Sequence, residues 1–247
     1  MRVLDIDLDF FLDEVAHWIN ADAGRLDAAD YPPWTTEKTL RFLETQCKLT
    51  RKVPGVAVER HGDVFARWRD AIDRGVLEPP FSVTHVDAHA DLGLGDAGYI
   101  YLLTELVFDP PDARRFPRVG HEGFTDGNWL SFAVACRWIS DLVYVFNTDD
   151  ERPNDLMVCV MEGFNTRADN IQLAGLTREQ LDNALYQRAW EAEHLEPKVP
   201  FEAVPWARFE SPGPPDFISL ARSPGFTPSE SDALYGLIRE RFVDELE

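Results

Sequence analysis

The chain has 247 residues, 45% of them hydrophobic, so it is long enough to bury a core and too apolar to remain disordered. Its 44 acidic and 24 basic residues give a formal charge of −20, which argues against nucleic acids and anionic membranes as partners, because both bind basic surfaces. We expect a cytoplasmic protein, because no apolar run reaches membrane-spanning length and the N-terminus carries acids where a signal peptide is apolar. The three cysteines have no C-x-x-C spacing, which predicts buried thiols rather than disulfides.

The first half of the chain alternates strand-like runs with amphipathic helices. Apolar runs predict strands at 1–11 (MRVLDIDLDFF) and at 79–92 (PPFSVTHVDAHADL), the second of which runs into a loop. Gly75 is placed to end one of the helices, because glycine is favoured just past a helix C-terminus. Helical spacing of the apolar residues predicts helices at 35–49, 61–75 and 95–108.

The second half continues this alternation. Residues 128–140 (NWLSFAVACRWIS) are apolar on nearly all sides, which predicts a helix wrapped by other layers. Thr177 and Gln180 have the spacing of a capping box at the start of a helix. Thr227 is expected to cap the last helix, at 227–242. Strands are predicted at 141–147, 156–161, 201–210 and 216–222.

The order of these elements predicts the fold class. Apolar strands that alternate with amphipathic helices are typical of an α/β fold with a mostly parallel, twisted sheet between two helical layers, a three-layer α/β/α arrangement. The length of 247 residues suits one α/β domain or two small ones, and we expect residues 1–247 to form a single domain. Ligands of such folds bind outside the C-terminal ends of the strands, so polar residues at strand ends are the candidates for a functional site.

Three carboxylates alternate with apolar residues at the start of the chain. Asp5, Asp7 and Asp9 follow a period of two, which places them on one face of a strand. Burying like charges without partners is costly. An edge strand with one wet face would account for the pattern, and so would a site in which a metal ion neutralises the acids.

A second acidic group follows the strand predicted at 79–92. Asp87, His89 and Asp91 form a D-x-H-x-D pattern, and His85 lies two residues before it on the same face. Carboxylates with an imidazole are an oxygen-rich ligand set that suits Mn²⁺ or a similar divalent ion. A polar loop with helix-capping aspartates is the alternative. Two acid-rich strand ends in one α/β sheet favour the metal site.

These motifs resemble those of a known superfamily. VDAHAD at 86–91 resembles the D-A-H-x-D metal motif of the arginase, agmatinase and deacetylase superfamily, and LDIDLD at 4–9 resembles its D-x-D strand. The closer resemblance is to the peptide arginases, with which the chain shares LDIDLDFF, an H-x-D-x-H-x-D segment, GNW and SLARSPGFTP. The resemblance implies an arginase-like or deacetylase-like fold with a permuted strand order, because the D-x-D strand comes first in this chain.

The resemblance also implies a metal centre. Arginase-like enzymes hold two Mn²⁺ ions that activate a bridging hydroxide. The D-x-D match assigns Asp5 and Asp7 as ligands, but an alternative register uses Asp7 and Asp9, and the shared strand face leaves both registers open. The D-A-H-x-D match assigns three further ligands: Asp87, His89 and Asp91.

Other site residues are less firmly indicated. Ordinary arginases have a glycine-rich motif with a ligand histidine that this chain lacks, and Asn128, His85 or His121 could take its place. Asp9, if it is not a ligand, and His85 are the candidate proton carriers, although His85 could equally orient a ligand carboxylate. Asn128 and Glu122 are the candidates for substrate binding. Ordinary loop polarity accounts better for three other acids after predicted strands: Asp149, Asp150 and Glu162.

The activity implied by the resemblance is that of a Mn²⁺-dependent peptide arginase. Such an enzyme hydrolyses arginine side chains to ornithine and urea within an arginine-containing precursor peptide, as a step of peptide maturation. The acidic surface agrees with a basic peptide as partner. Two alternatives remain: a deacetylase-type amidohydrolase, usually with one Zn²⁺, and a non-catalytic scaffold that binds a peptide. The sequence carries no signal for an oligomeric state.

Overall fold

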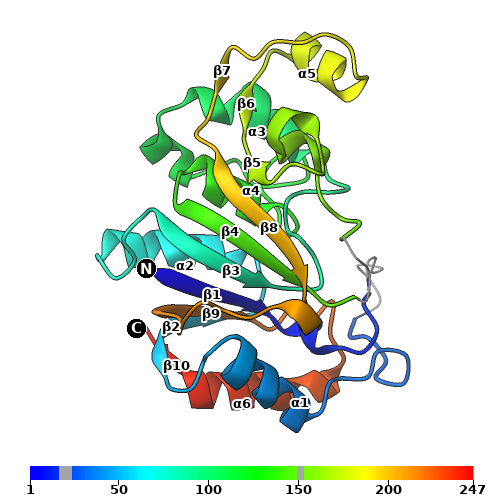
Figure 1. Cartoon of the computed structure of the whole chain (residues 1–247), viewed down its shortest axis with the longest axis vertical. Helices are drawn as coiled ribbons and strands as arrows, with labels where there is room; N and C mark the ends of the chain where they lie inside the picture. Colours follow the sequence, from blue (N-terminus) through cyan, green and yellow to red (C-terminus); the bar gives the residue numbers. More distant parts are fainter. Residues whose placement is uncertain (17–23, 149–152, 247) are drawn as a thin grey trace.

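The computed structural model describes residues 1–16, 24–148 and 153–246, and its centre is one large β-sheet (Figure 1). The strand order is β10-β2-β9-β1-β3-β4-β8-β5. Neighbouring strands from β10 to β8 are parallel, and β5 joins the edge of β8 in the antiparallel direction. The strands are β1 (Arg2–Asp7), β2 (Val53–Val58), β3 (Phe81–Val86), β4 (Ile139–Phe146), β5 (Asn170–Ile171), β8 (Val199–Pro205), β9 (Phe217–Ala221) and β10 (Val243–Glu245).

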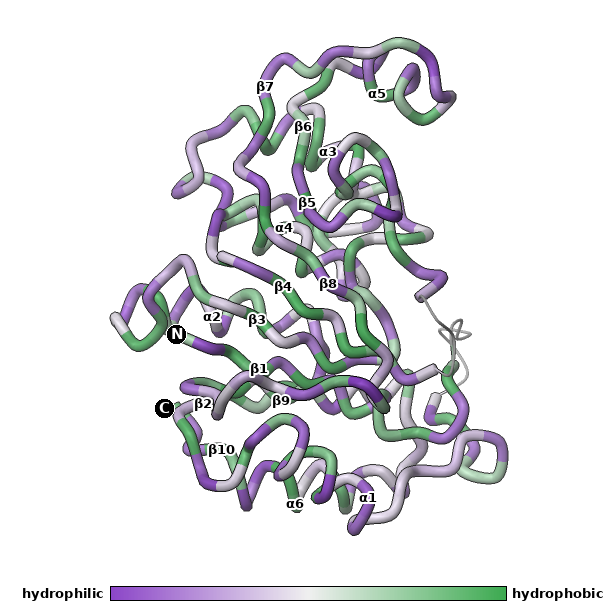
Figure 2. Tube along the Cα trace, in the orientation of Figure 1, coloured by the Kyte–Doolittle hydropathy of each residue, from purple (hydrophilic) through white to green (hydrophobic). Residues whose placement is uncertain are grey.

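Helices pack on both faces of this sheet, so the predicted α/β class is confirmed and the structure is compatible with the three-layer arrangement. One buried core joins the sheet to α2 (Asp63–Asp73), α3 (Gly98–Thr104) and α4 (Trp129–Ala135). The other core joins it to the segment that follows α1 (Thr36–Arg41) and to α6 (Asp232–Phe242). Figure 2 shows hydrophobic residues gathered along the central strands between these layers.

The outermost part of the chain lies beyond the sheet, at the top of Figure 1. There α5 (Arg178–Leu185) packs against α3, and β6 (Ala174–Gly175) pairs with β7 (His194–Leu195). Within the described ranges, no helix combines the length and the apolarity needed to cross a membrane.

The chain reverses its direction across the sheet at β1. From β1 it goes to β2, which lies on one side beyond β9, and then crosses to β3 on the other side. The C-terminal ends of these strands meet at one edge. A crevice for ligands forms at such a reversal, because the connections leave on opposite sides.

Most predicted elements are present, with shifted ends. The capping box of Thr177 and Gln180 starts α5, and Gly75 follows α2 with a φ of +70°. The segment predicted as a helix at 128–140 forms α4, and all seven residues of α4 are buried. The helix predicted at 35–49 begins as α1 after the Thr35 cap and continues as a π-helical turn.

Four predictions about local structure were wrong or incomplete. The strand predicted at 156–161 is replaced by 3₁₀ turns, and the first strand ends at Asp7. Thr227 does not cap the last helix, because its hydroxyl donates to backbone carbonyls and a separate 3₁₀ turn precedes α6. Strand β2 was not predicted, because Pro54 and Gly55 interrupt its apolar pattern.

Candidate metal centre

The sheet brings the two acidic motifs together at its C-terminal edge. Side chains alternate along β1, so Asp5 and Asp7 face the α2 and α4 layer while Leu4 and Ile6 pack into the opposite core. On the neighbouring strand β3, Asp5 pairs in register with His85, and Asp87 follows the last strand residue. The predicted sharing of one face is therefore confirmed for the two acids that lie within the strand.

Asp9 reaches the same place by a different route. Residues Leu8–Phe11 form a 3₁₀ turn, and the Asp7 carboxylate caps it by accepting a hydrogen bond from the Asp9 N–H at 3.3 Å. One oxygen of Asp9 then accepts from the Ala88 N–H at 3.4 Å, and the other lies 3.0 Å from Nδ1 of His89. The strand-alternation argument was wrong for Asp9, because the chain has left the strand before it.

A histidine that the sequence analysis did not single out occupies the centre of the acids. His61 follows β2 and precedes α2, and its side chain is 3% exposed. Its Nδ1 lies 3.1 Å from Asp7 Oδ2, 2.9 Å from Asp87 Oδ2 and 3.0 Å from Asp91 Oδ2. The sequence offers Asn128, His85 or His121 for this place. The only sequence signal for His61 is its position after β2, and that strand is obscured by its proline and glycine.

We call Asp7, Asp9, His61, Asp87, His89 and Asp91 the carboxylate–histidine cluster. Asp87 connects its two halves. Its Oδ2 faces Nδ1 of His61, and its Oδ1 lies 3.7 Å from Nδ1 of His89. An octahedral ion with ligands at about 2.1 Å holds adjacent ligand atoms roughly 3 Å apart. The distances around His61 match that spacing, and the buried Asp and His groups can hold a metal ion.

Each histidine of the cluster is held by its other nitrogen. His61 Nε2 lies 3.0 Å from Asp5 Oδ2, and His89 Nε2 lies 3.1 Å from the carbonyl oxygen of Ala16. Both contacts are to acceptors, so they place a proton on Nε2 and direct Nδ1 to the carboxylates. A carboxylate or carbonyl behind a ligand imidazole is the usual arrangement at protein metal sites.

Some atoms of the cluster lack hydrogen bonds of good geometry to any described residue, although all are buried: His61 Nδ1, Asp87 Oδ2 and Asp9 Oδ2. His61 Nδ1 and Asp87 Oδ2 lie 2.9 Å apart, and Asp9 Oδ2 lies 3.0 Å from Nδ1 of His89. Buried polar atoms of a native protein are nearly always hydrogen-bonded. A cation between these atoms would satisfy them, so the donor set fits a metal ion.

Residues from distant segments hold the ligand carboxylates in place. The Ser223 hydroxyl donates to Asp7 Oδ2 at 2.6 Å, and the indole N–H of Trp129 donates to Asp91 Oδ2 at 2.7 Å. The backbone N–H of Ala90 donates to Asp155 at 2.6 Å, which fixes the loop between the ligands. Trp129 and Ser223 belong to the GNW and SLARSPGFTP segments, but the sequence analysis assigned them no role.

His85 lies beneath the cluster and is fully buried. Its Nδ1 is 2.8 Å from Asp5 Oδ2, and its Nε2 is 3.1 Å from the carbonyl oxygen of His89. Burial lowers the pKa of His85, but the charges of Asp5 and Asp87 outweigh burial and raise the pKa overall. Contacts to two acceptors fix the His85 ring and place one of its nitrogens against Asp5. This geometry favours the orienting role over that of a proton carrier.

The cluster carries more negative charge than its histidines balance. Burial and the neighbouring Asp87 raise the pKa of Asp91 to about 6, and burial with Asp7 and Asp87 raises the pKa of Asp9 well above its usual value. Burial lowers the pKa of His61, but Asp5 and Asp7 outweigh burial and raise it. A metal ion and the Nδ1 proton compete for the same position, and a divalent cation neutralises more of the charge.

The two residues predicted to bind substrate, Asn128 and Glu122, do not belong to the carboxylate–histidine cluster. Asn128 uses its amide within its own loop: Oδ1 accepts from the Thr125 N–H at 2.8 Å, and Nδ2 donates to Asp96 at 2.9 Å and to the Gly123 carbonyl at 2.7 Å. It therefore anchors the loop before α4. Glu122 is exposed in a turn of that loop.

The remaining candidates also lie elsewhere. His121 is exposed in the same turn as Glu122. Glu162 forms an ion pair with Lys198 at 2.5 Å and accepts a hydrogen bond from Asn170. Asp149 and Asp150 lie outside the described residues.

Comparison with known proteins adds no relative. The chain matches no protein-family model, and no curated protein matches it. The function must therefore be argued from the geometry of the cluster and from the motifs that form it.

Proposed function

We propose that the chain is a hydrolase with two metal ions, of the arginase-like type, that acts on arginine side chains within peptides. The observation that supports it most directly is the position of Asp87, whose two oxygens face two different histidines. A carboxylate so placed can be shared by two cations. A single-metal site would need only one of the two histidines.

The contacts suggest which residues would hold each ion. His61, Asp7, Asp87 and Asp91 surround one position, and Asp9, Asp87 and His89 surround the other. Two acids of β1 and its following turn then supply the D-x-D ligands in the register Asp7 and Asp9. Asp5 orients His61 instead of binding metal. The oxygen-rich sets, each with one imidazole, suit Mn²⁺.

Each remaining group has a stated task in hydrolysis. Two bound cations would lower the pKa of a shared water to near neutrality. Asp5 and the Ala16 carbonyl keep His61 and His89 in the tautomer that presents Nδ1. Ser223 and Trp129 fix ligand carboxylates, so that little reorganisation is needed when charge develops. The acidic cluster attracts a guanidinium cation.

The substrate class rests on the sequence motifs. VDAHAD, LDIDLDFF, GNW and SLARSPGFTP together resemble the peptide arginases, and their residues meet at this cluster. The proposed reaction converts a peptidyl arginine to ornithine and urea, which suits a maturation step of a precursor peptide. The proposed fold is the arginase-like one in a permuted order, with the D-x-D strand β1 first in the chain and beside β3.

Mass spectrometry of an arginine peptide incubated with Mn²⁺-loaded protein, with a parallel urea assay, tests this proposal. We expect a mass change from arginine to ornithine and an equal amount of urea. His61→Ala should remove both, while His194→Ala, which changes a histidine on β7, should keep them. Bound metal without conversion would favour an amidohydrolase acting on acylated amines, and absence of metal would favour a binding scaffold.

A further inference from the structure

Within residues 1–16, 24–148 and 153–246, no strand pairs with part of one edge of the sheet. Strand β5 covers β8 only at Val199 and Pro200, and the Phe201 N–H donates to the carbonyl of Asp169 just beyond it. Strand alternation then directs the N–H and C=O of Ala203 to the same outer side. No described residue hydrogen-bonds to Ala203 from that side. We call Glu202–Pro205 the open β8 edge.

The chain that could have covered this edge turns away from it. Continued pairing would bring Ala168 and Arg167 opposite Glu202 and Ala203, but Thr166 and Arg167 form a turn closed by a hydrogen bond from the Ala168 N–H. Exposed edge strands are normally covered or blocked, because they can pair with another chain. Here the edge is left open where β5 ends.

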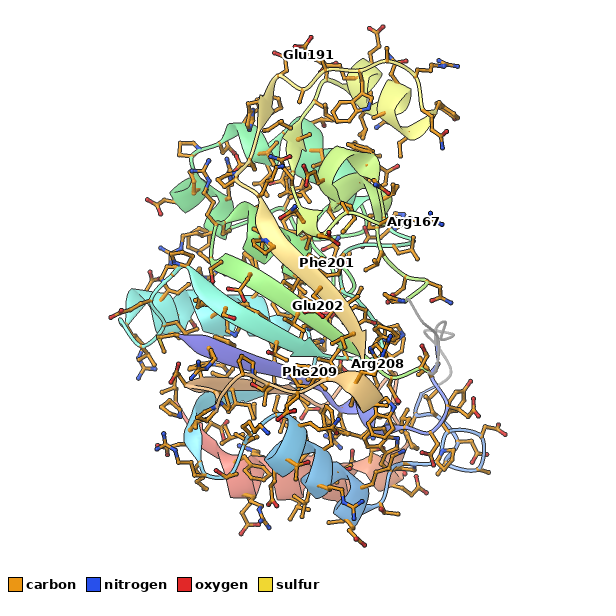
Figure 3. The ribbon with its side chains drawn as sticks, in the orientation of Figure 1. Arg167, Glu191, Phe201, Glu202, Arg208 and Phe209 are labelled. Carbon is orange, nitrogen blue, oxygen red and sulfur yellow. The ribbon has the colours of Figure 1, made fainter. Side chains whose placement is uncertain are left out.

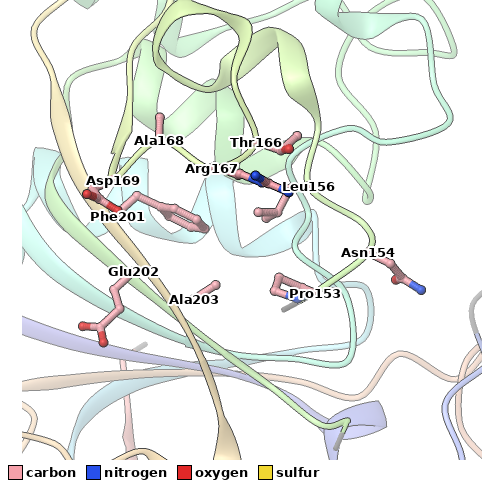
Figure 4. A pocket seen from close by; sticks show the side chains of 10 residues that line it. All are labelled: Pro153, Asn154, Leu156, Thr166, Arg167, Ala168, Asp169, Phe201, Glu202 and Ala203. Carbon is pink, nitrogen blue, oxygen red and sulfur yellow. The ribbon is translucent and has the colours of Figure 1, made fainter. Parts of the chain in front are cut away.

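A hollow of about 460 Å³ lies beside the open β8 edge (Figure 4). The ring of Phe201 points into it, toward Leu156 and Arg167 on the far wall. Asp169 and Glu202 belong to its rim, and the exposed Glu202 carboxylate points away from the Phe201 ring, on the other side of β8. The hollow thus offers an apolar floor and one positive charge, with two carboxylates on the rim beside the unpaired backbone groups.

The hollow is connected to the metal centre by a single residue. Asn154 and Leu156 line the hollow, and Asp155 between them accepts a hydrogen bond from Ala90. Ala90 lies between the ligands His89 and Asp91. The segment that forms one wall of the hollow therefore also touches the metal-binding loop.

We propose that an extended segment of the substrate peptide adds to the open β8 edge as a further strand, with one of its side chains in the hollow. This inference rests on the proposed function, which makes a peptide the substrate. Unpaired backbone groups select an extended chain, since β-addition uses main-chain hydrogen bonds for affinity and side-chain pockets for specificity. The rim carboxylates and the net charge of −20 favour a basic peptide.

The geometry separates docking from chemistry. Strands lie about 4.8 Å apart, so an added strand lies roughly 14 Å from β3, which carries the metal-binding loop. An extended chain covers about 3.3–3.6 Å per residue. The arginine that reacts should therefore lie about four residues or more from the docked segment. The edge would select peptides by the sequence flanking the arginine.

Fluorescence anisotropy tests the docking without needing turnover. The probe is a labelled peptide of alternating valine and threonine with one arginine, long enough to reach from the open β8 edge to the cluster. Peptides N-methylated at single backbone positions are compared with it. We expect losses of about tenfold in affinity at alternate positions of the docked segment, because only every second N–H faces β8. Absence of binding, or equal sensitivity at all positions, would overturn the inference.

Two protein variants provide matched evidence. Ala203→Pro removes the N–H that faces the open side of β8. Pro205, the next residue whose backbone faces that side, is already a proline, so strand β8 accommodates proline there. Glu202→Lys reverses a charge on the rim, and Glu191→Lys makes the same change far from the hollow (Figure 3). We expect Ala203→Pro to weaken peptide binding about tenfold and Glu202→Lys to weaken it several-fold. The control Glu191→Lys should bind the peptide with wild-type affinity. Wild-type affinity in both edge variants would contradict the docking.

Urea release from N-acetyl-arginine amide by the wild-type protein separates the two proposals. This small substrate cannot reach the β8 edge, so its hydrolysis depends on the metal centre alone. If the small substrate is hydrolysed and the edge variants bind the peptide as the wild type does, the proposed function stands and the docking site is rejected. Edge-dependent peptide binding without hydrolysis would keep the docking site and reject the function.

Discussion

The carboxylate–histidine cluster and a second buried charge group of the molecule are built on opposite principles. Glu196 is buried between two arginines: it accepts hydrogen bonds from Arg114 at 2.9 Å and from Arg137 at 2.8 Å. Arg114 also donates to three backbone carbonyls, so each of its three nitrogens makes a hydrogen bond. The carboxylate–histidine cluster instead carries surplus carboxylates and several buried atoms to which no described residue makes a hydrogen bond of good geometry.

The difference shows how to separate a structural charge group from a functional one. A structural ion pair balances its charges and satisfies its donors, because unpaired burial would destabilise the fold. Surplus negative charge is kept only where something else compensates it. At the cluster a cation would do so, and the fold holds the acids together by hydrogen bonds from residues behind them. The following predictions test this contrast.

The largest effect is expected when the shared ligand is removed. Asp87→Ala should reduce bound metal and arginine hydrolysis below detection, because both ions lose a ligand and the histidines lose their common partner. Metal content by mass spectrometry and urea release measure the two losses. Chelation should lower the melting temperature of the wild type but not of this variant. A variant that keeps both metals would remove Asp87 from the centre of the site.

The next effect distinguishes the two registers of the acidic strand. Asp9→Asn should bind one metal ion fewer, because it changes a ligand. Asp5→Asn should keep the metal stoichiometry and lower metal affinity or activity about 10- to 100-fold, because it changes only the support of His61. Metal counts on both proteins are the measurement. The reverse result would restore Asp5 and Asp7 as the ligand pair.

A stability effect without loss of metal is expected at the balanced pair. Arg114→Met should lower the free energy of unfolding by about 3 kcal/mol, because it removes the buried cation and leaves Glu196 with only the half-exposed Arg137 and His194, at 3.3 Å, as partners. Arg137→Met changes a half-exposed partner and should cost at most about 1 kcal/mol. Urea denaturation compares the two variants. Both should bind metal as the wild type does, and a loss of metal would show that the two regions are coupled.

The smallest effect concerns pH. Burial would raise the pKa of Glu196, but hydrogen bonds from Arg114 and Arg137 outweigh burial and lower it from 4.5 to about 2. A lowered folded-state pKa stabilises the fold above pH 4.5 and loses that contribution as the pH falls toward 2. The stability difference between wild type and Arg114→Met should therefore shrink over this range. A difference that stays constant would assign the stabilisation to packing.

Local patterns predicted most of the fold. The apolar runs located β1, β3, β4, β8 and β9, because alternation of buried side chains is a property of the strand itself. Helix signals such as the capping box of Thr177 and the helix end at Gly75 also depend only on residues near in the sequence. The prediction of a strand at 156–161 was wrong, because a short apolar run can also be buried in a turn.

The site was determined only in part by the sequence. Its strand-end motifs gave Asp7, Asp87, His89 and Asp91, since strand ends of a parallel sheet meet at one edge. Whether Asp5 or Asp9 faces the cluster depends on where β1 ends, and strand alternation alone does not define that end.

Only the tertiary structure decided which residues join the carboxylate–histidine cluster and which contact it from behind. His61 joins the acids because β2 runs two strands away from β1 and delivers its C-terminal end to the same edge. Ser223, Trp129 and Asp155 arrive from segments far apart in the chain. Long-range packing sets these contacts, and no local pattern encodes them. The sequence by itself determined which acids could bind a cation, and the fold decided which of them face it.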